Sequence, residues 1–317
     1  MFPASGHATP AAGLPIVHNP HYDVPDWDRE HRFPMSKFTL LREYLLRETI
    51  IRPEQLRIPK MVDRAILQGV HVPEYIEAFV TGALDRKALR RIGLPWTVAL
   101  VRRTLTAAGG TLLAARLALQ YGIACNSGGG THHAFPDFGS GFCIFNDVSV
   151  AIRLLQQEGQ VHRVLIVDLD VHQGDGTAWI HQSEPNVFTF SMHCQANFPF
   201  RKQQSDLDVP LEVGLEDEAY LKELGSRLPD LVAAFKPGLV MYNAGADPHR
   251  DDPLGKLCLT SEGLYQRDLF VFRTCARAGV PVASVIGGGY STDVPALARR
   301  HAIVHQAAST VFREFHL

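Results

Sequence analysis

Runs of five to eight mainly apolar residues recur along the chain, and each is followed by polar residues or glycine. Apolar side chains at consecutive positions, rather than at alternate ones, are typical of strands that are buried on both faces of a sheet. We therefore predict strands over the following ranges: 122–126, 164–171, 187–193, 239–243 and 282–286.

Helical spacing fills the segments between these runs. Apolar residues three and four positions apart follow Ser36, which we interpret as the N-cap of a helix. A longer helical pattern covers 98–120 and ends before Gly122. Ser261 and Asp293 are the expected starts of two further helices. The chain thus alternates between strands and helices.

This alternation predicts an α/β fold of three layers, in which a central, mostly parallel sheet carries helices on both faces. The sequence contains no internal repeat, no low-complexity linker and no shift in composition. We therefore interpret residues 1–317 as a single domain, in which about residues 1–12 form a frayed N-terminal extension.

Polar and glycine residues gather directly after four of the predicted strands. They occupy residues 126–131, 168–175, 245–247 and 287–290. The carboxyl ends of parallel strands meet at one edge of a sheet, and ligands of α/β proteins bind outside that edge. We therefore expect the functional site there.

The composition excludes several classes of protein. Of the 317 residues, 46% are hydrophobic and 20% are charged, which is usual for a globular protein. A net charge of −2 and the lack of a dense Lys/Arg run argue against nucleic acid as a partner. The N-terminus lacks a secretory pattern, no apolar run is long enough to span a membrane, and the five cysteines are scattered. We therefore expect a reduced protein in the cytoplasm, without membrane contact.

The candidate metal ligands are Asp170, His172 and Asp247. Asp170 and His172 are two positions apart, so on an extended strand both side chains would leave the same face. Small residues at 244–246 precede Asp247 and leave room for an ion. Two carboxylates and one imidazole suit zinc or a similar first-row ion, iron included. The plainer alternatives are a loop-capping aspartate beside a solvated histidine, and Asp247 as a turn residue.

Two adjacent histidines follow the three glycines at 128–130. Glycines let the backbone approach a ligand closely, and from an irregular segment His132 and His133 can both face one cleft. Imidazole titrates near neutral pH, as a general base must. Asp168 and Asp175 are suited to orient the two rings, although either could instead cap a turn or a helix.

Tyr290 ends a second glycine run, at 287–289. A tyrosine in this position can donate a hydrogen bond to a carbonyl oxygen as negative charge develops on it, and an ordinary core aromatic is the alternative. The run lacks the lysine and the spacing of phosphate-binding loops, so we rank phosphate binding low.

Together these motifs resemble the zinc-dependent histone deacetylase family, which has the arginase/deacetylase fold. The resemblance extends over most of the chain, from residues 31–35 through 141–143 to 288–290, and the motifs occur in family order. Residues 243–245 and 267–273 look most like the class IV branch and its bacterial relatives.

The resemblance implies a role for each catalytic candidate. His133 would be the general base toward the attacking water and then the acid toward the leaving lysine amine, and Asp175 would support it. His132, paired with Asp168, would stay more cationic and act electrostatically. Tyr290 would polarise the acyl carbonyl.

The resemblance also implies ligand sites. One Zn²⁺ per chain would be bound by Asp170, His172 and Asp247. The substrate tunnel would be formed by Gly141, Phe142, Phe198 and Leu254. An inner pocket below the metal would be lined by Arg32 and the glycines of 128–130. A structural K⁺ would lie near Asp168, Asp170, His172, Ser191 and Met192.

Arginase relatives of this fold bind two metal ions with additional carboxylates. One of these carboxylates lies two residues after the strand histidine, and another lies two residues before the late aspartate. Here those positions are Gly174 and Gly245. The sequence therefore disfavours a second metal ion.

The implied activity is hydrolysis of the side-chain amide of acyl-lysine in proteins, with acetyl or longer acyl groups. The alternative is an amidohydrolase of the same fold that acts on acetylpolyamines or other small acylated amines. A cationic substrate would favour an acidic rim. Candidate rim residues, which are more plainly interpreted as solvated loop carboxylates, are Asp206, Asp208, Asp251 and Asp252. A silent metal-binding or interaction protein is a third hypothesis, against which the intact His132, His133 and Tyr290 argue.

Overall fold

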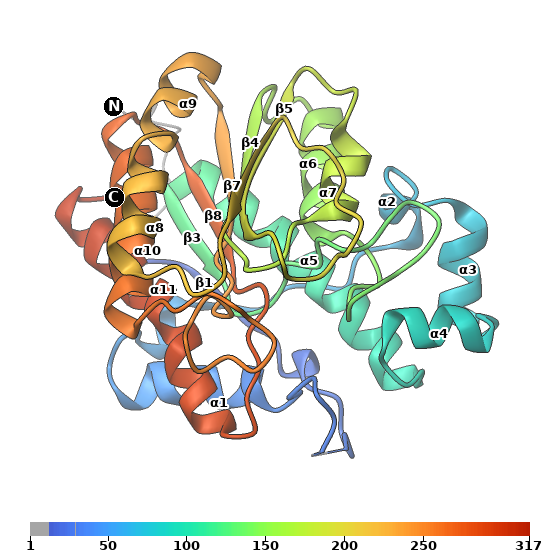
Figure 1. Cartoon of the computed structure of the whole chain (residues 1–317). Coiled ribbons are helices and arrows are strands. Elements are labelled where there is room, and N and C mark those ends of the chain that lie inside the picture. Colours follow the sequence, from blue (N-terminus) through green and yellow to red (C-terminus); the bar gives the residue numbers. More distant parts are fainter. Residues whose placement is uncertain (1–12, 29) are drawn as a thin grey trace.

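A sheet of eight parallel strands lies at the centre of the molecule (Figure 1). The computed structural model describes residues 13–28 and 30–317. From one edge to the other the strands are β2 (Leu56–Arg57), β1 (Ile16–Val17), β3 (Ile123–Asn126), β8 (Val282–Val285), β7 (Leu239–Asn243), β4 (Val164–Asp168), β5 (Val187–Cys194) and β6 (Leu207–Leu211). The predicted α/β fold is confirmed, whereas the expected extension at 1–12 lies outside the described residues.

The five predicted strands are all present, and three others were missed. β1 and β2 have two residues each, which is too short to give a pattern, and β6 exposes residues at the sheet edge. The prediction that β4 continues to residue 171 is wrong. The strand ends at Asp168, whose carboxylate accepts a hydrogen bond from the backbone N–H of Asp170 and so turns the chain out of the sheet (3.2 Å).

Helices cover both faces of the sheet (Figure 1). One layer contains α5 (Val98–Tyr121), α6 (Asp147–Gln157) and α7 (Asp175–His181). The opposite layer contains α1 (Lys37–Arg47), α8 (Asp217–Gly225), α9 (Leu228–Phe235), α10 (Ser261–Arg277) and α11 (Val294–Glu314). Three shorter helices lie beside the first layer, namely α2 (Arg64–Leu67), α3 (Pro73–Thr81) and α4 (Arg86–Ile92). The 3₁₀ turns are η1 (Pro20–Tyr22) and η2 (Pro53–Gln55).

The helix ends agree in part with the predicted caps. Ser36 precedes α1 but its side chain makes no capping hydrogen bond. Gly122 ends α5 with a φ of 83°, a conformation that glycine adopts without strain. Asp293 caps α11 as predicted. The prediction for α10 is wrong by one residue, because the side chain of Thr260, not Ser261, accepts the capping hydrogen bond.

The strand order brings the segments with polar residues together. β4 and β7 are neighbours, and Asp168 at the end of β4 is in register with Asn243 at the end of β7. β3, β4, β7 and β8 are buried along their whole length, so the core lies on both sides of these strands. In the described part of the chain, no helix combines the length and the apolar content needed to cross a membrane.

Candidate active site

Asp170, His172 and Asp247 converge in two loops, one after β4 and one after β7. The Nδ1 atom of His172 lies 3.0 Å from a carboxylate oxygen of Asp170 and 3.1 Å from one of Asp247. One donor atom from each residue lies within 4.8 Å of the other two, and all three side chains are buried. The expectation that Asp170 and His172 share a strand face is wrong, because both lie beyond the end of β4. The loop, not the pleat of a strand, brings them together.

Backbone groups fix the two carboxylates. The N–H of Gly288 donates to Asp170 (2.7 Å), and the N–H of Val171 donates to Asp247 (2.9 Å). Glycine is required here because a Cβ on Gly288 would lie 2.1 Å from an Asp247 oxygen. The glycine loop after β8 therefore closes directly over the carboxylates.

These three side chains fit one divalent cation. Burial, with the charge of Asp170 as a further cause, raises the pKa of Asp247 to about 7, because two carboxylates lie close together in a buried place. One imidazole nitrogen faces oxygen atoms from both carboxylates, which is a donor set that zinc accepts. The carboxylates that would bind a second ion have no space. A Cβ on Gly245 would lie 2.6 Å from Asp170, and one on Gly174 would lie 2.5 Å from Asp168.

His132 and His133 lie on the loop after β3, and each ring is held by its own aspartate. Nδ1 of His132 is 2.7 Å from Asp168, and Nδ1 of His133 is 2.6 Å from Asp175, the first residue of α7. The two ring centroids are 4.1 Å apart. The structure therefore brings together both histidine–aspartate pairs that the sequence predicted.

The surroundings separate the pKa values of the two histidines. Burial opposes the charge on His132, but Asp168 and Asp170 outweigh it and raise the pKa of His132 to about 9. Burial and the nearby charge of His132 lower the pKa of His133 to about 4, against the opposing effect of Asp175. At neutral pH, His132 is therefore charged and His133 is neutral.

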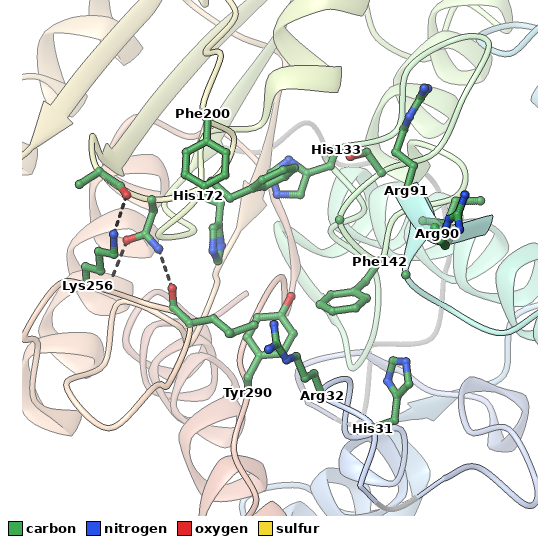
Figure 2. Close-up of a pocket in the computed structure, with 18 of the residues that line it drawn as sticks. His31, Arg32, Arg90, Arg91, His133, Phe142, His172, Phe200, Lys256 and Tyr290 are labelled. Atoms are coloured by element: carbon green, nitrogen blue, oxygen red, sulfur yellow. Dashed lines mark hydrogen bonds between the residues drawn. The ribbon is translucent and has the colours of Figure 1, made fainter. Parts of the chain in front are cut away.

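Tyr290 lies across the cavity from His133 (Figure 2). Its backbone N–H donates to Asp252 (2.7 Å), and the ammonium of Lys37 donates to the carbonyl of Gly289 (3.1 Å). Burial raises the pKa of the Tyr290 phenol well above its usual value, and nearby carboxylates such as Asp247 add to this effect. The hydroxyl therefore keeps its proton and can donate it in a hydrogen bond.

A cavity of about 1090 Å³ leads from the surface to His133, His172 and Tyr290 (Figure 2). It is lined by the four predicted tunnel residues Gly141, Phe142, Phe198 and Leu254. A Cβ on Gly141 would lie 2.8 Å from the ring of His133, so a larger residue there would push against the base.

A smaller cavity of about 40 Å³ continues beyond these side chains. Of the three predicted glycines, Gly129 and Gly130 line it and Gly128 is not among the described lining residues. The prediction for Arg32 is wrong, since Arg32 is exposed and lines the outer cavity. Lys37 and Arg103, both buried, line the inner cavity together with His132. The sequence did offer a signal for Lys37, because it lies four residues before a buried leucine on the apolar face of α1.

Sequence reasoning placed Arg267 in a stretch that carries the resemblance, but it predicted neither the burial of this residue on α10 nor a role for it. Its guanidinium donates to the carbonyl of Leu169 (3.2 Å) and to that of Gly245 (2.8 Å), one on each loop that carries metal-ligand candidates. It is paired with Asp268 (2.8 Å), which also accepts from the hydroxyl of Tyr242 (2.5 Å). Arg267 therefore ties the two loops together from behind.

Two other groups of sequence candidates have different outcomes. Asp168 and Ser191 are register partners on β4 and β5, with Met192 next along the strand, so they are adjacent, and a K⁺ ion beside them stays a prediction. The four carboxylates considered for an acidic rim under the polyamine alternative do not form one, although Asp28 and Glu30 do line the cavity. Residues absent from the described lining of the cavity are Asp206, Asp208, Asp251 and Asp252. Asp252 is instead buried under Tyr290, where its carboxylate accepts backbone hydrogen bonds.

Comparisons with known proteins agree with this architecture. A family model described as "Histone deacetylase domain" matches residues 31–306. An uncharacterized protein of Picosynechococcus sp. is 56% identical over 300 residues, which cover 95% of this chain and 100% of that protein. Histone deacetylase 2 of Arabidopsis thaliana is 31% identical over 296 residues, which cover 89% of this chain and 76% of that protein.

A solved structure supports the fold independently. The crystal structure of the HDA15 HD domain superposes with a TM-score of 0.76 at 21% identity and covers 95% of this chain and 91% of that chain. The family model spans most of the sequence, and the stretch that it matches contains the histidine pairs, the candidate metal ligands and Tyr290. This chain therefore belongs to the histone deacetylase family and is a hydrolase that acts on amides.

Proposed function

We propose that the protein is a zinc-dependent lysine deacylase that removes acetyl or longer acyl groups from lysine side chains of proteins. One observation carries this proposal. A neutral, buried histidine, a protonated tyrosine and a three-residue metal-ligand set meet at the inner end of one aromatic-walled cavity. Hydrolysis of an amide needs a base for water, a group that polarises the carbonyl and a proton for the leaving amine.

His133 has the position of the base and then of the acid. Its Nδ1 is hydrogen bonded to Asp175, so Nε2 is left to take a proton from water and to deliver it to the amine nitrogen. His132 carries a positive charge close by and helps to stabilise the negative charge that develops on the acyl oxygen. The two adjacent histidines thereby take different tasks.

Tyr290 and the candidate metal ligands act on the acyl carbonyl. A Zn²⁺ bound by Asp170, His172 and Asp247 would supply Lewis acidity to the carbonyl and to the attacking water. The hydroxyl of Tyr290 donates a hydrogen bond to the same carbonyl oxygen, and its burial keeps that donor protonated. Water is the nucleophile, so no covalent enzyme intermediate is required.

The cavity walls fit the lysine side chain. Phe142 and Phe198 offer apolar surface to the four methylene groups of lysine, while the amide reaches His133 and Tyr290. The smaller cavity beyond Tyr290 lies where an acyl chain longer than acetyl would extend. We accordingly propose one zinc ion per chain, a single domain over 1–317, and action in the cytoplasm.

The test is hydrolysis of acetyl-, butyryl- and longer acyl-lysine peptides, with acetylpolyamines in parallel, by the purified zinc-loaded protein. We expect turnover of peptides, and a loss of about 100-fold or more in kcat for both His133→Ala and Tyr290→Phe. Tyr265→Phe and His162→Ala are matched controls, because neither residue lines the cavity, and both should keep full rates.

Turnover of polyamines without turnover of peptides would instead assign the protein to the small-amine hydrolases. Full activity in the Tyr290→Phe and His133→Ala variants would refute the catalytic roles of both residues.

A further inference from the structure

Basic side chains outnumber acidic ones where the cavity opens to solvent. Among the residues that the structure describes, the exposed ionic residues that line this mouth are four cations, Arg32, Arg90, Arg91 and Lys256, and two anions, Asp28 and Glu30. Both anions belong to the loop that also carries Arg32, so their charges lie beside a cation of the same loop. The remaining cations face the cavity from other parts of the chain (Figure 2).

Arg90 and Arg91 lie in the last turn of α4, which has no acidic residue in its sequence. The carboxylate of Asp85, just before the helix, is occupied in capping the N–H of Ala88 (2.7 Å). Arg91 packs over the ring of Phe138, whereas Arg90 has no hydrogen bond or ion pair with any residue that the structure describes. The Arg90 charge is thus not neutralised within that part of the protein.

Backbone hydrogen bonds hold this end of α4 against the tunnel wall. The N–H of Gly141 donates to the carbonyl of Arg91 (3.2 Å), and the N–H of Phe142 donates to the carbonyl of Ile92 (2.7 Å). The backbone that carries the two arginines is therefore held beside the tunnel. A substrate whose acyl-lysine lies between Phe142 and Phe198 must place its flanking residues beside this helix end.

Lys256 flanks the mouth on the opposite side (Figure 2). Its ammonium donates to the carbonyl of Ala196 (2.9 Å), which keeps the charge at the rim without neutralising it. Positive charges on both sides of the mouth attract an anionic substrate and repel a polycation, and the two carboxylates in the described lining, Asp28 and Glu30, both lie on the loop that carries Arg32.

We propose that the mouth selects acyl-lysines in acidic sequence, with glutamate or aspartate on the side that faces α4. This inference rests on the proposed deacylase function and names the substrate class of the same site. Arg90 is the main specificity-determining residue, since it is exposed, unpaired within the described chain and on the rim. It acts on the flanking residues and not on the reacting amide.

The test compares two peptides that carry the same acetyl-lysine, one flanked by glutamates and one by lysines, with an acetylpolyamine as third substrate. At about 0.01 M salt, where the Debye length is about 30 Å, we expect the acidic peptide to have a kcat/KM about tenfold higher, mainly through KM. At about 1 M salt this preference should nearly vanish.

Two variants locate the effect. Arg90→Glu should reverse or abolish the preference, whereas Lys87→Glu, on the same helix but away from the mouth, makes the same change of net charge and should leave it in place. Equal rates for both peptides, faster turnover of the basic peptide or the polyamine, or equal effects of the two variants would overturn the inference while the deacylase function stands. No turnover of either peptide would overturn both.

Discussion

Charged side chains at the inner end of the cavity have partners within the protein, whereas the charge of Arg90 at its mouth has none among the described residues. At the inner end, Asp168, Asp170, Asp175 and Asp247 are buried, and each is held by a histidine or by backbone N–H groups. At the mouth, the exposed Arg90 side chain has no partner among the described residues. Buried charges must be compensated within the protein, whereas exposed charges remain available to a substrate. The catalytic groups are thus fixed by contacts inside the protein. Selectivity among substrates depends on exposed charges that have no partner among the described residues.

Removal of a candidate metal ligand should have the largest effect. We expect Asp247→Asn to lower kcat by at least about 1000-fold, because the cation would lose a charged donor and Tyr290 alone would polarise the carbonyl. Measurement of bound zinc per chain should show a parallel loss. Asp251→Asn, at an exposed neighbouring position, is the matched control. Full metal content and full activity in Asp247→Asn would mean that the metal site has been misplaced.

Substitution of Arg267, the buried arginine behind the two loops, should have the next largest effect. Arg267→Met leaves Asp268 buried without its cation and two loop carbonyls without a donor, so we expect a loss of about 3–5 kcal/mol in the free energy of unfolding, measured with urea. The double variant with Asp268→Leu should regain part of this stability, because the unpaired charge is gone. The zinc affinity should be lowered in Arg267→Met and should stay low in the double variant, since in both the carbonyls of Leu169 and Gly245 lack their donor. If the double variant recovered both its stability and its zinc affinity, Arg267 would serve only to neutralise Asp268 and would not position the two loops.

The smallest effect concerns pH. His133 is active when neutral, and burial lowers its pKa to about 4, so kcat/KM should fall as the pH decreases toward that value. His132 acts when charged, and its pKa of about 9 places the alkaline fall above that of an ordinary histidine. Each limb should change the rate about tenfold per pH unit beyond its pKa. Rates are measured with zinc content checked at each pH.

The Arg90→Glu variant sharpens the comparison between the two regions. It should alter KM for charged peptides and leave both limbs of the pH profile where they are, because the mouth does not contact the histidines. A shift of either limb in this variant would show that the two regions are electrically coupled.

The sequence predicted the inner end better than the mouth, for a physical reason. Asp168 ends an apolar strand and His172 follows in the next loop. Because parallel strands place their carboxyl ends at one edge, strand order was not needed to group such residues. The burial of Arg267 was not predicted, because a charged residue in a helix usually lies on the solvent face. Only its packing behind two loops in the structure shows that it is buried. Arg32 was assigned to the wrong cavity because a loop pattern does not reveal which side chain points inward.

The mouth depends on contacts between segments that are distant in the sequence. Arg90 reaches the rim only because α4 is hydrogen bonded to the loop at Gly141 and Phe142, some fifty residues later. No period of apolar residues encodes that contact. Four of the six residues 86–91 are Arg or Lys, so the interpretation of the sequence as lacking a dense Lys/Arg run is wrong at this helix. The place of these charges beside the tunnel required the structure.

Gly174 and Gly245 also bear on how such a protein could evolve. A Cβ at either position would collide with a carboxylate that already serves the site. A lineage with this arrangement could not acquire a second metal ion through one substitution. The first new carboxylate would damage the existing site before a second ion could bind and compensate for the loss. The two glycines thus make a change from one metal ion to two difficult by single mutations. Such a change would first require the two loops to move apart.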